Sequence, residues 1–283
     1  MKNQELLTTA AGVTMPWIIY GTAWKKERTQ DLVVKAIHAG FKGIDTACQP
    51  KHYEEALVGT ALQKLERDGI KRETLFVQTK FTPLDGQDPQ KVPYDKNAPI
   101  ESQVMQSFEV STKNLQTKYV DSLVLHSPLF PHTLLMKAWS AMEAIQKAGG
   151  ARQLGISNCY HPEVLKQLYI DAKVKPAVVQ NRFYQQTGYD KDLRKWCVDH
   201  GVIYQSFWTL TANPHILGSN AIKHIAQKYQ KTEVQIFFRY LHLSGIVPLT
   251  GTCSEQHMQE DLNVFDFELT ADELKNIKQI IEK

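Results

Sequence analysis

The segment DSLVLHSP, residues 121–128, is apolar at its centre, LVL, and ends abruptly in polar residues. A short apolar run without alternation is typical of a parallel strand covered on both faces. Short β-branched or apolar runs of similar length recur from one end of the chain to the other. They predict eight strands, at residues 17–24, 43–47, 75–80, 121–127, 153–158, 177–183, 202–208 and 245–250.

Helical patterns separate these runs, at residues 30–39, 134–148, 163–171, 220–229 and 271–282. The last of them follows Thr270, with Glu273 three residues further on, which predicts a capping box. Repeated strand–helix alternation predicts an α/β fold, a (β/α)8 TIM barrel. An open, doubly wound sheet is the alternative. No linker or repeat divides the chain, so residues 1–283 are expected to form a single domain.

Two segments depart from the alternation. Residues 6–14 have the pattern of a short hairpin with Gly12 in the turn, which would close the N-terminal end of a barrel. Residues 81–99, FTPLDGQDPQKVPYDKNAP, contain four prolines and no periodicity. Long irregular loops in compact domains are usually functional or disordered. This loop follows the third expected strand, so it would overhang the face on which barrel enzymes place their active sites.

The composition excludes several classes of function. The chain has 283 residues, 42% of them hydrophobic, and a net charge of +3 from scattered basic residues, so nucleic acid is not an expected partner. No apolar run approaches the roughly 20 residues of a membrane span. The N-terminus lacks a signal-peptide pattern, which favours a cytoplasmic location. The histidines and cysteines lack metal-ligand spacing, so no metal is expected.

Four ionisable residues lie at or just past the ends of expected strands: Asp45, Tyr53, Lys80 and His126. A phenol with a pKa near ~10 is a poor acid at neutral pH. A buried lysine beside it would stabilise the phenolate, and a carboxylate would hold that lysine charged. A nearby histidine can hydrogen-bond the group that receives the proton. The set therefore predicts a general acid directed at an oxygen atom.

With these residues in place, the chain resembles the aldo-keto reductases from about Val13 to Phe267. The supporting segments are MPWIIYGTAW, GFKGIDTA, EEALVGTAL, VQTK, YVDSLVLHSP, RQLGISN, VVQNRF and VPLTGT followed by HMQEDL. The resemblance implies reduction of aldehydes or ketones to alcohols by hydride transfer from NAD(P)H, with a tyrosine as general acid. Asp45, Lys80 and His126 match the catalytic aspartate, lysine and histidine of that family.

The resemblance also implies a cofactor site. Ser157 and Asn158 match the pair that binds the nicotinamide carboxamide, and Gln180 matches the residue that joins them. Phe207 takes the place of the ring that stacks on the nicotinamide. The remaining cofactor residues implied by position are Gly21, Thr22, Asp45, Thr250, Thr252, His257, Glu260 and Asp261.

The tyrosine departs from the family's spacing. The position five residues after Asp45 is Pro50, and counting back seven residues from Gly59 leads to His52. The segment CQPKHY therefore carries about two extra residues, and His52 and Tyr53 compete for the role of proton donor. We favour Tyr53 because a phenol is the acid that a Lys–Asp pair would tune; a catalytic His52 beside a structural tyrosine is the alternative.

The adenosine end departs as well. NADPH-selective relatives commonly have a lysine after the late proline and an arginine downstream, whereas this chain has Leu249 and His257. Cations suited to the 2′-phosphate are thus missing at these positions. On family grounds NADPH remains the expected cofactor, with NADH left open.

The substrate pocket is expected to be walled by Trp24, His52, Leu129 and Trp208 and shaped by loop 81–99. The chain ends in or just after a helical run, so the family's C-terminal tail over the pocket is expected to be absent. The expected partner is a small carbonyl compound, and the family favours a monomer. A nucleotide-binding, redox-sensing regulatory subunit on the same scaffold is the alternative function.

Overall fold

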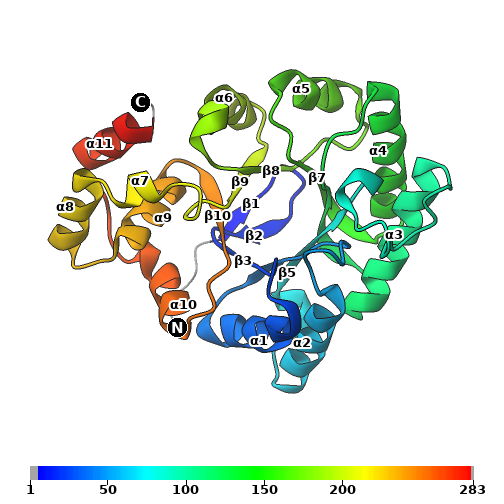
Figure 1. Cartoon of the computed structure of the whole chain (residues 1–283), viewed down its shortest axis with the longest axis horizontal. Helices are drawn as coiled ribbons and strands as arrows, with labels where there is room; N and C mark the ends of the chain where they lie inside the picture. The colour runs from blue at the N-terminus through cyan, green and yellow to red at the C-terminus, as the bar shows by residue number, and fades with distance from the viewer. Residues whose placement is uncertain (1–5, 282–283) are drawn as a thin grey trace.

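A computed structural model describes residues 6–281 of the chain. Its centre is a closed barrel of parallel strands in the order β10-β3-β4-β5-β6-β7-β8-β9 (Figure 1). Closure comes from β10 pairing with β3, where Leu249 lies opposite Ile19 and Thr250 opposite Tyr20. The predicted barrel is confirmed, and closure excludes the open sheet. The strands are β3 (Ile19–Gly21), β4 (Gly43–Asp45), β5 (Phe76–Phe81), β6 (Val120–Leu125), β7 (Ala151–Ser157), β8 (Val178–Arg182), β9 (Ile203–Phe207) and β10 (Ile246–Thr250).

Each expected strand overlaps one of these strands, but the first observed strand, β3, is much shorter than residues 17–24. β3 ends at Gly21, and Trp24 and Lys26 beyond it have φ angles of 63° and 50°. Left-handed backbone of this kind cannot continue a strand, and it is uncommon for residues other than glycine. The apolar run therefore turns out of the sheet before it ends.

Helices surround the barrel (Figure 1). All of the helical patterns read from the sequence are present, and the capping box is confirmed, since Thr270 N donates to Glu273 Oε2 at 2.8 Å and Glu273 N donates to Thr270 Oγ1 at 3.3 Å. The helices next to the barrel are α1 (Thr29–Ala39), α2 (Glu55–Arg67), α3 (Ile100–Leu115), α4 (His132–Lys147), α5 (Pro162–Asp171), α6 (Lys191–Asp199), α9 (Glu233–Leu243) and α10 (Glu255–Leu262).

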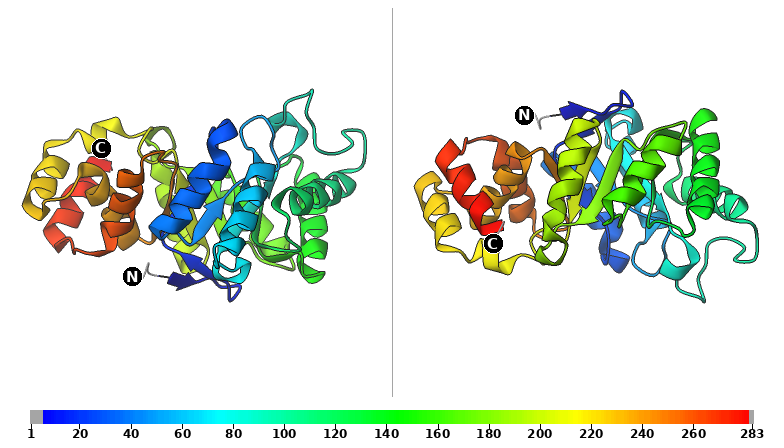
Figure 2. Two further views of the ribbon diagram at one scale, coloured as in Figure 1. Left: turned by 90° about the horizontal axis from the view of Figure 1, so that it is seen from below. Right: turned by 90° about the horizontal axis from the view of Figure 1, so that it is seen from above.

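A further group of helices lies outside this ring on one side of the molecule (Figures 1 and 2). It consists of α7 (Pro214–Leu217), α8 (Asn220–Tyr229) and α11 (Ala271–Ile281). Lys228 of α8 and Glu273 of α11 form an ion pair with 2.6 Å between Nζ and Oε1. The segment between β9 and β10 therefore carries the extra helices α7 and α8, and the C-terminal helix α11 packs against α8.

The predicted hairpin is also present, formed by β1 (Leu6–Thr8) and β2 (Thr14–Pro16). Its Met15 is fully buried against residues that point into the barrel, among them Ile19, Phe76 and Val178. Figure 2 shows the hairpin and the long loop at opposite ends of the barrel. The hairpin thus fills the N-terminal end and leaves the C-terminal end for the site.

Loop 82–99 is tied to the barrel mouth by polar side chains. Tyr94 donates from its hydroxyl to Thr82 O at 2.8 Å, and Gln87 Nε2 donates to Cys48 O at 3.0 Å. Gln49 Nε2 reaches Gly86 O at 2.6 Å. The irregular segment around residues 48–53 and the start of the long loop therefore hold each other in place.

Along residues 6–281 no helix is long and apolar enough to cross a membrane.

Candidate active site

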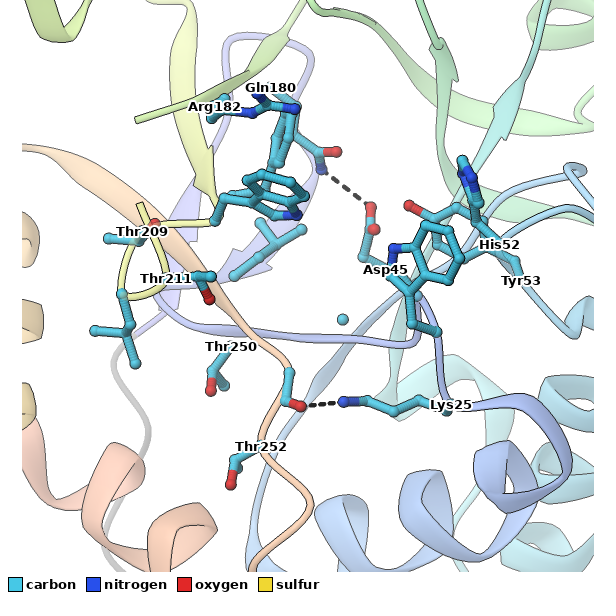
Figure 3. A pocket seen from close by; sticks show the side chains of 18 of the residues that line it. Lys25, Asp45, His52, Tyr53, Gln180, Arg182, Thr209, Thr211, Thr250 and Thr252 are labelled. Carbon is cyan, nitrogen blue, oxygen red and sulfur yellow. Dashed lines mark hydrogen bonds between the residues drawn. The ribbon is translucent and has the colours of Figure 1, made fainter. Parts of the chain in front are cut away.

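A cavity of about 860 Å³ opens at the C-terminal end of the barrel (Figure 3). Most of the residues singled out from the sequence line it. Thr22, Lys80 and Ser157 are fully or almost fully buried and lie behind the wall. Leu129 is placed differently from the expectation: it packs against the main hydrophobic core and does not line the cavity. The lining residues predicted from sequence are Gly21, Trp24, Asp45, His52, Tyr53, His126, Asn158, Gln180, Phe207, Trp208, Thr250, Thr252, His257, Glu260 and Asp261.

The floor of the cavity holds a buried ion pair. Lys80 Nζ lies 2.6 Å from Asp45 Oδ2, and the two side chains are 0% and 3% exposed. Lys80 Nζ also donates to Thr46 O at 2.8 Å. Burial lowers the pKa of Lys80, and Asp45 opposes that shift by favouring the charged form. A buried charge persists only when it is paired and hydrogen-bonded, and here both conditions are met.

Three glutamines complete the shell around Asp45. Gln78 Nε2 and Gln180 Nε2 donate to Asp45 Oδ1 at 2.8 and 3.0 Å. The same two amide groups donate to Gln205 Oε1 at 2.8 and 2.9 Å. Donors from β5 and β8 thus fix one carboxylate oxygen while Lys80 takes the other, so Asp45 has little freedom to rotate.

Tyr53 and His126 stand over this ion pair. Lys80 Nζ lies 5.1 Å from the centroid of the Tyr53 ring, and the Tyr53 and His126 ring centroids are 6.2 Å apart. Burial raises the pKa of the Tyr53 phenol, and the charge of Asp45 adds to the rise. This direction is opposite to the lowering by Lys80 that we expected, because burial disfavours the phenolate and the hydrogen bonds of Lys80 Nζ go to Asp45 and Thr46 rather than to the phenol. The phenol therefore holds its proton at neutral pH.

His52 also lines the cavity, next to Tyr53, but its ring has other contacts. Its Nδ1 lies 2.9 Å from Gln49 Oε1, and its ring lies 4.1 Å from the Trp24 ring, centroid to centroid. Burial, and then Lys51, lower the pKa of His52. It is thus uncharged at neutral pH, and its ring contacts Gln49 and Trp24 rather than the ion pair.

His126 is oriented by a threonine from the long loop. Thr82 Oγ1 and His126 Nδ1 are 2.6 Å apart. Burial, followed by the charge of Lys80, holds the pKa of His126 well below its usual range. A neutral imidazole carries one N–H. If the Thr82 hydroxyl donates to Nδ1, that proton lies on Nε2, where it can be donated to a ligand oxygen.

The neighbouring strand ends present amide groups and a flat ring. Ser157 Oγ donates to Gln180 O at 2.7 Å, and Asn158, with φ of 52°, donates from its amide to His126 O at 2.8 Å. Because both hydrogen bonds of Gln180 Nε2 are taken, its Oε1 is the atom left to accept from a carboxamide. Phe207 offers an aromatic face at the same end. These groups fit a nicotinamide ring.

The other end of the cavity is suited to a nucleotide. Thr250 Oγ1 donates to Asp261 Oδ2 at 2.7 Å, and burial raises the pKa of Asp261 to about 7. His257 is exposed on α10. Lys25, which the sequence reading did not single out, reaches from the loop after β3 to bond Gly251 O (Figure 3), and its Nζ lies 3.5 Å from Cys253 Sγ. A cation thus lies at this end although the positions usual in the family lack one.

Sequence reasoning missed several residues of the site. Gln78, Gln205 and Thr82 carried no signal, because single polar residues inside apolar runs do not reveal which carboxylate or imidazole they will contact. Arg182 and Lys25 had a weak signal, because each lies close to an assigned residue. Arg182 is two positions after Gln180, and Lys25 directly follows Trp24.

Within residues 6–281 no cluster of three or more His, Cys, Asp and Glu side chains is arranged to hold a metal ion.

Comparisons with known proteins agree with this geometry. A profile of the Aldo/keto reductase family matches residues 14–282. An uncharacterized oxidoreductase, YtbE, of Bacillus subtilis is 29% identical over 99% of this chain and 94% of its own length. A glyoxal reductase of the same bacterium is 28% identical over 94% of this chain and 89% of its own.

Solved structures show the same fold. The crystal structure of an aldo-keto reductase of the silkworm Bombyx mori, complexed with NADPH, superposes with a TM-score of 0.83. The two share 23% identity, and the match covers 98% of this chain and 88% of the silkworm chain. With a family profile that spans almost the whole barrel and a site assembled from the matching strand ends, this chain belongs to the aldo-keto reductase family.

Proposed function

We propose that the protein reduces aldehydes or ketones to alcohols with a nicotinamide cofactor, using Tyr53 as the general acid. One observation carries the proposal: the buried Asp45–Lys80 pair lies under the Tyr53 ring, beside His126, in a cavity of about 860 Å³. Relatives named as a glyoxal reductase and a methylglyoxal reductase support the substrate class.

Each residue then has a distinct task. A bound reduced nicotinamide supplies the hydride. Tyr53 gives its phenolic proton to the carbonyl oxygen as negative charge develops there. Lys80, held charged by Asp45, stabilises the phenolate that remains. His126 donates from Nε2 to the same oxygen and orients it, and Thr82 positions the imidazole.

NADPH is the proposed cofactor, with NADH as the second candidate. Lys25 supports NADPH, because it places a positive charge at the phosphate end of the cavity, next to Gly251 and Thr252. Glu260 and Asp261 on the same side are acidic and oppose an additional phosphate, most strongly when Asp261 is ionised. These opposing charges are the reason to measure both cofactors.

The first test is a turnover assay. The purified chain is mixed with a panel of aldehydes, diketones and sugars and with NADPH or NADH, and the absorbance of the reduced cofactor is followed. We expect substrate-dependent oxidation, with a higher kcat/KM for NADPH than for NADH. Binding of the cofactor without turnover of any carbonyl compound would favour the regulatory alternative and overturn the proposal.

The pH dependence should separate Tyr53 from His52. At saturating cofactor we expect kcat to stay constant from about pH 6 to pH 9, because Tyr53 keeps its proton and His126 stays neutral throughout this range. A histidine acid must be charged, and burial lowers the pKa of His52 from 6.5. A catalytic His52 would therefore give a kcat that falls about tenfold per pH unit above that pKa. Cofactor is kept saturating because Asp261, whose pKa is about 7, changes its charge in this pH range and would otherwise change cofactor binding.

A further inference from the structure

Arg182 brings an unpaired positive charge to the cavity. It ends β8 and lines the cavity wall. Its guanidinium carbon lies 4.1 Å from the centroid of the Trp208 ring and 5.3 Å from that of Tyr184. No ion pair or side-chain hydrogen bond is made by Arg182 within residues 6–281, and its Nε is buried without a partner. A guanidinium stacked on a ring still has its in-plane N–H groups available for an anion.

The strand places this charge close to the ion pair. Gln180 points into the barrel, where it donates to Asp45, and Arg182 follows it by two residues on the same strand. Side chains two residues apart lie on one face of a strand, roughly 6.5 Å apart along it. Arg182 therefore lies one layer above Gln180, toward the end of the strand, and Figure 3 shows both side chains on the same side of the cavity.

A chain of hydrogen bonds connects Arg182 with His126 along the rim. Asn158 donates from its amide to His126 O at 2.8 Å, Tyr160 donates from its hydroxyl to Asn158 Oδ1 at 3.1 Å, and Arg182 N donates to the Tyr160 hydroxyl at 3.3 Å. The backbone that carries the guanidinium is thus fixed relative to the imidazole. A cation that lines the same cavity as Tyr53 and His126 and has no acidic partner among residues 6–281 would recognise an anionic group of a bound substrate.

We propose that Arg182 forms a subsite for a carboxylate carried by the carbonyl substrate, with Trp208 as the ring that holds the guanidinium in place. The inference rests on the proposed function and adds the substrate class, namely aldehydes or ketones with a carboxylate. The phosphates of the cofactor are the other source of an anion. Thr250, Thr252 and Lys25 lie at the opposite side of the cavity from Arg182 and Gln180 (Figure 3), which favours the substrate.

The test uses a matched pair of aldehydes, 4-carboxybenzaldehyde and its methyl ester. For Arg182→Met we expect kcat/KM to fall roughly 10- to 100-fold with the carboxylate, because a charge-assisted interaction is lost, and to change less than about twofold with the ester. Arg182→Lys keeps the charge without the planar fork and should lie between the two. Arg194→Met is the matched control: Arg194 lies over the Phe183 ring at 5.6 Å, outside the cavity lining, and both substrates should be unaffected.

Other outcomes would overturn the inference. Equal losses for both aldehydes, together with weaker NADPH binding measured by quenching of tryptophan fluorescence, would assign Arg182 to a cofactor phosphate. No loss for either aldehyde would remove the subsite altogether. If the variants fail to fold, the wild type alone decides: 4-methylbenzoate should inhibit it competitively and 4-methylbenzamide should not, and equal inhibition would contradict the subsite. Turnover of the methyl ester tests the proposed function separately.

Discussion

Replacing Tyr53 by phenylalanine is expected to lower kcat by about 10²- to 10⁴-fold, the contribution usual for a general acid. The substitution removes one hydroxyl and keeps the ring that lies 5.1 Å from Lys80 Nζ and 6.2 Å from the His126 ring. The hydride would then be transferred to a carbonyl whose developing charge receives no proton from the protein. Single-turnover measurement of cofactor oxidation at saturating substrate gives the rate of the chemical step.

Two variants act as controls for this experiment. His52→Ala should lower kcat less than about tenfold, since His52 is uncharged at neutral pH and is held by Gln49 and Trp24. Tyr189→Phe removes the hydroxyl of another buried tyrosine. That hydroxyl lies 3.0 Å from His215 Nε2, and Tyr189 does not line the cavity, so activity should be retained. Near-normal turnover of Tyr53→Phe combined with loss of activity in His52→Ala would exchange the two assignments.

The barrel could be predicted because its signal is repeated along the chain. Each strand is a short apolar run, and the run at residues 121–127 alone would not separate a strand from a buried helix; only the alternation with helical patterns does so. Helix α9 shows the limit of this reading. Its sequence, EVQIFFRYLHL, is buried on nearly all sides, and residues 233–243 are not among the helical patterns read from the sequence, although Thr232 and Gln235 form a capping box at the start of the helix.

The site was predictable in part, for a different reason. Asp45, Lys80 and His126 stand at strand ends, and the ends of parallel strands in a barrel meet at one face. Lys25 and Arg182 join the site through tertiary contacts. Lys25 crosses to the loop after β10, and Arg182 stacks on Trp208, a residue with a φ of 56°. Neither contact leaves a pattern in the sequence. The direction of the Tyr53 pKa shift also depends on burial, which strand and helix patterns do not give.

Breaking the Asp45–Lys80 pair should have the largest effect on stability. We expect Asp45→Asn and Lys80→Met each to lower the free energy of unfolding by about 3–5 kcal/mol, because each leaves one buried charge without its partner. The side chains are 3% and 0% exposed, so water cannot replace the missing partner without local opening. In Asp45→Asn the new side chain has one acceptor and one donor group where the carboxylate had two acceptors. If its NH2 group faces Lys80, two donors meet. If its NH2 group faces Gln78 and Gln180, the two glutamine donors lose their acceptor. Urea denaturation followed by circular dichroism measures the change.

The double variant Asp45→Asn/Lys80→Met distinguishes a charge effect from a loss of packing. If the single losses arise from unpaired buried charge, the double variant removes both charges and should be less destabilised than the sum of the singles, by about 0.5–3 kcal/mol. The surface pair Lys35–Asp31, with side chains 41% and 67% exposed and 3.2 Å between Nζ and Oδ2, is the matched control. Asp31→Asn should cost no more than about 1 kcal/mol, since solvent screens an exposed pair. Additive losses in the double variant would mean that Asp45 and Lys80 stabilise the barrel independently, and that Lys80 is not held charged by Asp45 under Tyr53.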